Sequence, residues 1–98
     1  MRLDTTHIRL LPVTGTFAEN KDVARDVRIK KINPALKKGN EVVLDFAGID
    51  AVTQSFVHAL ISELIREYGS EVLDVVFFKN CNEKVRSIID IVVEYMQV

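Results

Sequence analysis

Hydrophobic and polar positions along the chain follow two kinds of pattern. Short, mostly apolar runs at 6–13, 41–46 and 72–78 have the length and the β-branched content of strands. Longer segments follow each run, and in the last two of them apolar residues recur every three or four positions, as in amphipathic helices. The order β-α-β-α-β-α predicts an α/β fold, with right-handed crossovers and helices packed on a mixed or mainly parallel sheet.

Two of the apolar runs carry further information about their place in the sheet. The run at 41–46 has a single polar break before Phe46, and such runs suit strands that are covered on both faces. The run at 6–13 contains Pro12, which cannot donate a ladder hydrogen bond. Pro12 therefore predicts an edge position or the end of that strand.

The first helix is expected to begin after Asn20, a favourable N-cap, and to end or kink near Ile32 because Pro34 follows. Its apolar stripe is imperfect, since Val27 falls nearly opposite Ile32 on an ideal α-helix. Gly39 suits the end of this segment, because glycine readily adopts the left-handed conformation found after a helix.

The second helix opens at the polar cluster 53–55 and stops at Gly69, and the third is capped by Asn80 or Asn82. Their predicted core-facing stripes are Val57, Leu60, Ile61, Leu64, Ile65 and Tyr68 in the second helix, and Val85, Ile88, Ile89, Val92 and Met96 in the third. Three apolar residues lie off the last stripe: Ile91, Val93 and Tyr95. They either face a partner, including a second copy, or are covered by the N-terminal segment.

Composition narrows the class of protein. The 98 residues fit a single domain, 1–98, and 48% apolar content suffices for a compact core. Thirteen basic and 14 acidic residues are spread along the chain, so no nucleic-acid footprint is expected. No run is long enough for a membrane span, and a single cysteine, Cys81, favours a reducing cytoplasm.

One connection, from the middle strand to the second helix, resembles a known family. Its residues read Asp45-Phe46-x-Gly48 at the strand end and Thr53-Gln54-Ser55-Phe56 at the helix start. This pattern, together with the Asn-Pro-Ala-Leu-Lys-Lys-Gly segment at 33–39, is similar to small bacterial STAS-like domains of unknown function. STAS domains also form bacterial anti-sigma factor antagonists, and the likeness covers about 20–96.

The resemblance implies a regulatory protein-binding module that is not an enzyme and needs no cofactor. In STAS antagonists a hydroxyl in this loop is phosphorylated by a partner, a histidine-kinase-like ATPase. Alignment with that loop puts Gln54 at the acceptor position and Ser55 at the next hydroxyl. Since Gln54 has no hydroxyl, either Ser55 or Thr53 takes over, or the module binds its partner without this switch.

The site prediction therefore centres on 48–58. The candidates for partner contact or phosphorylation are Thr53, Gln54, Ser55, Phe56 and His58, and the residues expected to shape the loop are Asp45, Gly48 and Asp50. Each has a structural alternative: the hydroxyls suit helix caps, the Phe56 ring suits packing under the loop, and Asp45 suits hydrogen bonds to turn amides near Gly48. His58 shares a face with Ser62 and Arg66, which is expected to be solvated.

Other function classes stay open at this point. The start of the second helix is also suited to a small anion or nucleotide, although no glycine-rich cradle is present. The third helix suits a structural homo-oligomer. Asp45 resembles the acceptor of a receiver domain, yet no acidic pair follows the first strand. Cys81 precedes a helix that would lower its thiol pKa, but no base accompanies it, and no metal site is predicted.

Overall fold

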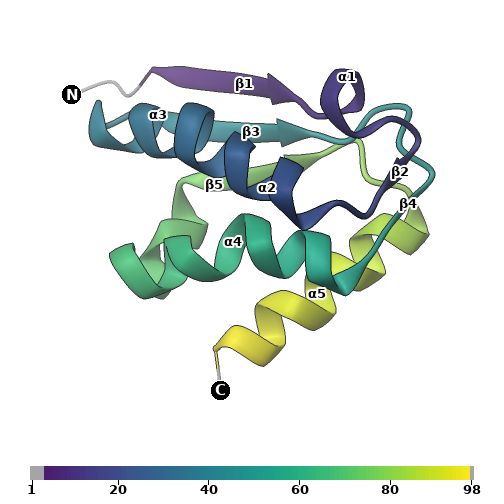
Figure 1. Cartoon of the computed structure of the whole chain (residues 1–98). Helices are drawn as coiled ribbons and strands as arrows, with labels where there is room; N and C mark the ends of the chain where they lie inside the picture. Colours follow the sequence, from purple (N-terminus) through teal and green to yellow (C-terminus); the bar gives the residue numbers. More distant parts are fainter. Residues whose placement is uncertain (1–3, 98) are drawn as a thin grey trace.

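The computed structural model describes residues 4–97, in which a parallel sheet is covered by helices on one side (Figure 1). The sheet has three strands in the order β1-β3-β5. Their bounds are β1 (Thr5–Arg9), β3 (Glu41–Asp45) and β5 (Val76–Lys79). Both strand pairs are parallel. In this order β3 is the central strand and β1 is an edge, as predicted. The α/β prediction is confirmed.

The helices lie together on one face of this sheet (Figure 1). They are α2 (Lys21–Val27), α3 (Asn33–Lys37), α4 (Gln54–Tyr68) and α5 (Glu83–Met96). The strand order advances in one direction, so right-handed crossovers place every connecting helix on the same face. The prediction that the middle strand is covered on both faces is wrong. Val42 and Leu44 are fully buried, whereas Val43 is only half-buried and its neighbour Phe77 is exposed.

The run predicted as a strand at 6–13 changes conformation halfway. The strand ends at Arg9, and α1 (Leu11–Thr14) follows as one helical turn, with Pro12 in its first turn. Proline is tolerated there because the first amides of a helix have no partner within it. A second, two-stranded parallel sheet, formed by β2 (Phe17–Ala18) and β4 (Ala51–Val52), was not predicted.

The segment around Pro34 stays helical instead of ending near Ile32, but the regular α-helix is interrupted before Pro34, as the alternative of a kink implied. A π-helical segment, η1 (Arg28–Ile32), joins α2 to α3, and the Asn33 amide donates to the carbonyl of Arg28, five residues back. The wider turn brings Val27 and Ile32 to the same side of the helix, where both are buried. The predicted opposition of these two faces is therefore wrong, because it assumed regular α-helical spacing.

The other helix ends agree with the sequence. Asn20 caps α2 by accepting from the amides of Asp22 and Val23. Gly39 follows α3 with φ +80°, Gly69 ends α4, and Asn82 caps α5. The predicted strand at 72–78 is shortened, because η2 (Ser70–Asp74) is a 3-10 helix.

The core fills the space between the sheet and the helices. Its largest fully buried side chains are Phe46, Phe56, Leu10, Ile32, Leu44, Leu60, Ile61, Leu64 and Ile89. Burying such side chains stabilises the fold by about 1.5–3 kcal/mol each relative to exposure. Within residues 4–97, no helix combines the length and the apolar character that crossing a bilayer requires.

Candidate functional site

The loop between β3 and α4 is anchored at the carboxyl edge of the sheet by Asp45. Its Oδ1 accepts a hydrogen bond from the Ala47 amide at 2.9 Å and from Asn80 Nδ2 at 2.9 Å. The Asn80 amide, followed by the Ala47 amide, lowers the pKa of Asp45 below its ordinary value of 3.8. The prediction that Asp45 accepts a hydrogen bond from a turn amide is confirmed.

Gly48 and Asp50 hold the rest of the loop in place. Gly48 has φ +83°, and a Cβ at this position would lie 2.7 Å from Leu11 Cδ2 of α1. The Asp50 amide donates to the carbonyl of Thr16 at 2.8 Å, and its carbonyl accepts from Asn82 Nδ2 at 2.9 Å. The loop thus connects to the N-cap of α5, and both residues shape it through their backbones.

Thr53, and not Ser55, caps α4. Thr53 has extended backbone angles, and its Oγ1 accepts a hydrogen bond from the Phe56 amide at 3.1 Å. Ser55 lies in the first turn with an exposed side chain, as does Gln54. The hydroxyl of Thr53 therefore has a structural role, while the side chains of Gln54 and Ser55 are free to meet another molecule.

Two other candidate residues behave differently from each other. The Phe56 ring is fully buried in the core, so Phe56 is not a contact residue. Its burial instead anchors the first turn of α4 to the core. His58, one turn after Gln54, is half-buried. The expected solvated face at His58 is wrong at Ser62, which is only 3% exposed because α2 packs along α4 there. Arg66 is exposed and forms an ion pair with Glu63 at 2.8 Å.

A pocket of about 440 Å³ opens beside the start of α4. Its lining combines three candidate residues with residues from two other helices: Gln54, Ser55, His58 and Ala59 from α4, Lys21 from α2, and Ile91, Val92 and Tyr95 from α5. The side chains of Ile91 and Tyr95 are 47% and 73% exposed. Of the two alternatives for them, cover by the N-terminal segment is not observed within residues 4–97. The contribution of α5 and α2 to the site was not predicted.

A second, basic hollow continues from this pocket between α2 and α4. It has a volume of about 300 Å³ and shares Lys21, His58 and Ala59 with the first. The additional charged residues that line it are Asp22, Arg25, Arg28, Glu63 and Arg66. Residues 21–38 hold seven of the 13 Lys and Arg residues but two of the 14 Asp and Glu residues, a net charge of +5, which leaves −6 for the rest.

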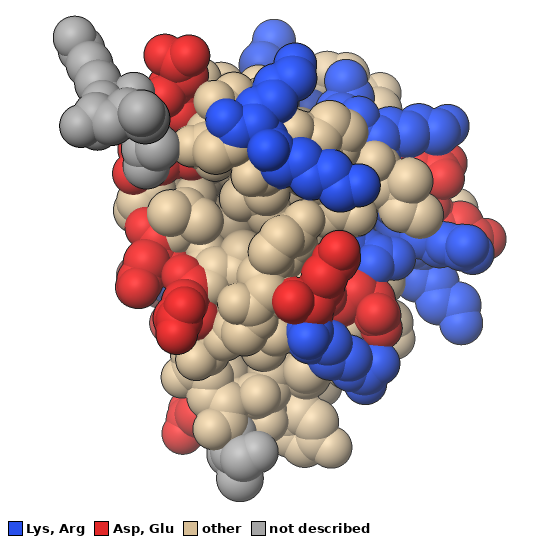
Figure 2. Space-filling view, turned by 90° about the vertical axis from the view of Figure 1, so that its left-hand side faces the viewer, with Lys and Arg blue, Asp and Glu red and all other residues tan. Residues whose placement is uncertain are grey.

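The surface reflects this charge separation. Figure 2, which views the molecule from the left-hand side of Figure 1, shows Lys and Arg side chains gathered along the top and the right, with several acidic side chains at the left and others between the basic ones. The basic side chains thus gather on part of the surface, in keeping with the positive net charge of residues 21–38.

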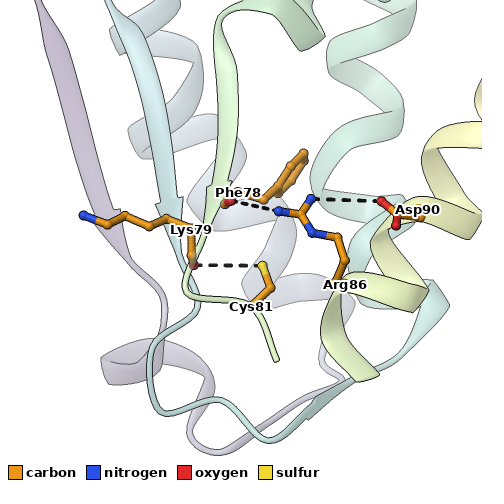
Figure 3. A network of polar contacts seen from close by, with 5 residues as sticks. All are labelled: Phe78, Lys79, Cys81, Arg86 and Asp90. Atoms are coloured by element: carbon orange, nitrogen blue, oxygen red, sulfur yellow. Dashed lines mark hydrogen bonds and ion pairs between the residues drawn. The ribbon is translucent and has the colours of Figure 1, made fainter. Parts of the chain in front are cut away.

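Cys81 is not activated as a nucleophile. Burial raises the pKa of its thiol, and the nearby Arg86 lowers it by less. The Arg86 guanidinium is directed elsewhere, since it donates to the Phe78 carbonyl at 3.2 Å and lies 4.0 Å from Asp90 (Figure 3). The thiol itself lies 3.9 Å from the Lys79 carbonyl. The expected lowering of its pKa by the helix N-terminus is therefore wrong.

The alternative that the chain is a receiver domain lacks the acidic residues that such a domain needs beside its acceptor. Asp45 and Lys79 are paired in register on β3 and β5, but the residue of β1 in register with Asp45 is the basic Arg9. Receivers need acidic residues there to hold a metal ion. Among residues 4–97, no group of three or more His, Cys, Asp or Glu side chains is placed to bind a metal.

Comparison with protein-family models gives one match. Residues 23–86 match the model of a STAS-like domain of unknown function (DUF4325). Searches among curated proteins and among solved structures gave no match. The matched range contains the loop, Gln54, Ser55 and His58, whereas the pocket residues Ile91 and Tyr95 lie beyond it. With two thirds of its length matched and with the parallel sheet and helix start that the resemblance implied, the chain belongs to the family of STAS-like domains of unknown function.

Proposed function

We propose that this domain is a non-catalytic regulatory module that binds a protein partner through the loop and helix start at 48–58. The observation that carries the proposal is the composition of the pocket. Gln54 and Ser55 are exposed at its entrance, and Ile91 and Tyr95 of α5 form an exposed apolar wall beside them. Protein interfaces commonly combine apolar and aromatic anchors with a polar rim.

The partner we propose is a histidine-kinase-like ATPase, and this choice rests on the resemblance to anti-sigma factor antagonists. The interaction would differ from theirs in its control. Gln54 stands at the position of the phosphoacceptor and has no hydroxyl, and the hydroxyl of Thr53 already accepts from the Phe56 amide. We therefore propose binding without a phosphorylation switch at the acceptor position of the antagonists, while the neighbouring hydroxyl of Ser55 is exposed to the partner.

Binding of a small anion at the same helix start is less well supported. The Phe56 amide, one of the first-turn donors, is already bonded to Thr53. Of the residues that α5 contributes to the pocket, only Tyr95 has a side-chain donor, and the aliphatic side chains of Ile91 and Val92 offer an anion no hydrogen bonds. A protein side chain gains from burying the apolar wall of α5, whereas a phosphate group does not.

The proposal is tested first by site-specific cross-linking in the cells that naturally make the protein. A photo-reactive residue replaces Gln54 at the pocket, or Glu71, an exposed residue of η2, as the control position. We expect one ATPase of the stated class to be cross-linked from position 54 and not from position 71. The same product from both positions, or no product from position 54, contradicts the proposal.

Titration with the purified partner then tests the surface. Gln54→Arg and Ser55→Arg should each weaken binding about tenfold or more, because a bulky charge at the entrance blocks the pocket. Phe77→Ala, on the uncovered sheet face, is the matched control and should leave the affinity unchanged. Circular dichroism confirms that each variant is folded. Unchanged affinity in both arginine variants overturns the assignment of the surface.

A further inference from the structure

We infer that the exposed face of α5, together with the pocket, pairs with the same surface of a second copy of this chain. This surface, called here the α5 patch, consists of the residues that line the pocket together with three exposed charged residues near it, Arg25, Asp90 and Glu94. A two-fold symmetric interface requires a patch that is complementary to itself. The α5 patch meets this requirement in its shape and in its charge.

Shape complementarity comes from a hollow that lies next to protruding apolar groups. The pocket has a volume of about 440 Å³, and Tyr95 and Ile91 on its rim are 73% and 47% exposed. Their spacing of four residues puts them on successive turns of one helix face. In a two-fold pair, the apolar side chains of each copy face the hollow of the other, which removes apolar area from water.

Charge complementarity points to the same occupant. On the α2 side, the exposed basic residues Lys21 and Arg25 outnumber the exposed acidic residue Asp22. On α5, Asp90 and Glu94 are exposed next to Ile91 and Tyr95 without lining the pocket, and Asp90 lies 4.0 Å from Arg86 of the same helix. A two-fold axis through the patch places the acidic side of each copy opposite the basic side of the other. A partner of uniform charge would match only one side.

The pairing has a consequence for the site, and this step rests on the proposed function. Gln54, Ser55 and His58 line the pocket that the second copy covers. Self-association and partner binding then compete for one surface. The domain would be available to its partner mainly at low concentration, and the monomer–dimer equilibrium would regulate it without covalent modification.

A small protein–protein interface sets the scale of the expected contact. An interface at the low end of the usual range buries about 600 Å² per copy. That is about a tenth of the 5991 Å² surface of the chain. Buried area alone does not fix affinity, and for an interface at this low end we expect a weak, reversible dimer with a dissociation constant of roughly 10–100 µM.

Sedimentation equilibrium of the full chain between about 5 and 500 µM measures this association. We expect a rise from monomer to dimer, which Tyr95→Ala and Ile91→Asp each weaken about tenfold or more. Phe77→Ala is the matched control, because Phe77 is similarly exposed at 43% but lies on the uncovered sheet face. A monomer throughout this range, or an equal loss in the control, overturns the inference.

A charge exchange tests the two-fold arrangement itself. Lys21→Glu and Glu94→Lys should each weaken the dimer, and the double variant should restore it, because residue 21 of one copy then faces the opposite charge at residue 94 of the other. Failure of the double variant to restore association excludes this arrangement.

The two histidines report where the second copy lies. NMR signals of the His58 ring should shift with protein concentration, whereas those of His7, exposed on the uncovered sheet face, should not. A shift of His7 alone places the contact elsewhere and overturns the inference. These measurements need no other partner. If association fails while position 54 still cross-links an ATPase, the proposed function survives without this regulation.

Discussion

Replacement of Thr53 by alanine tests whether this residue stabilises the start of α4, in contrast to the exposed Ser55, which is free to bind a partner. The Thr53 Oγ1 accepts from the Phe56 amide at 3.1 Å, and alanine leaves that first-turn amide without its partner. Loss of a threonine N-cap costs about 1 kcal/mol of unfolding free energy. For a domain of this size, that cost corresponds to a melting temperature lower by about 4–8 °C.

Ser55→Ala is the matched control, because it removes the same kind of hydroxyl two residues later. The Ser55 side chain is exposed in the first turn and does not cap the helix, so we expect a change within about 0.5 kcal/mol. Thr53→Ser should retain most of the stability, since serine caps equally well. Urea unfolding at pH 7, monitored by circular dichroism, measures all three variants.

The outcome shows which of the two hydroxyls stabilises the fold by capping α4. A loss for Ser55→Ala as large as for Thr53→Ala would refute the assignment of the cap. So would an unchanged stability of Thr53→Ala. If the prediction holds, any effect of Ser55 substitutions on partner affinity results from lost contacts at the interface and not from a less stable α4.

Two further predictions concern the loop. Gly48→Ala should destabilise the fold by about 1–2 kcal/mol, because alanine is strained at the positive φ of this position. The loss should exceed that of Gly39→Ala, which has the same strain but no atom within 4 Å of the new Cβ, whereas the new Cβ at Gly48 meets Leu11. Thermal unfolding of both variants measures the difference, and equal losses would show that Leu11 moves aside without cost. Because the pKa of Asp45 is lowered in the fold, its stabilising contribution is present above the ordinary value of 3.8 and is lost as the pH falls through the lower, folded value. The unfolding free energy should therefore fall more steeply below pH 4 in the natural protein than in Asp45→Asn, and parallel pH profiles would contradict this role.

The sequence by itself determined the features that depend on neighbouring residues. Helix caps are local, because a side chain at the cap reaches only the next two or three amides. Asn20 and Asn82 therefore mark their helices correctly, as does Gly69 with its positive φ. The order of strands and helices and the STAS-like pattern of the loop also follow from local periodicity and spacing, and they predicted the α/β fold and the family.

Only the tertiary structure decided how long each element runs and which faces are covered. Val27 and Ile32 share a side because both belong to the buried core, and the π-helical turn makes this possible. Leu11 turns away from the strand into α1, where its side chain reaches Gly48. Such choices depend on contacts between residues distant in sequence, and local propensities are weak compared with that packing.

The candidate site likewise combines residues that the sequence places together with residues that only the tertiary structure brings to them. Gln54, Ser55 and His58 follow one another on α4, so the sequence could place them together at the helix start. Ile91 and Tyr95 complete the pocket from α5, more than 30 residues away, and Lys21 joins them from α2. The packing of three helices on one face of the sheet brings these residues together, because the strand order lets every crossover return on the same side.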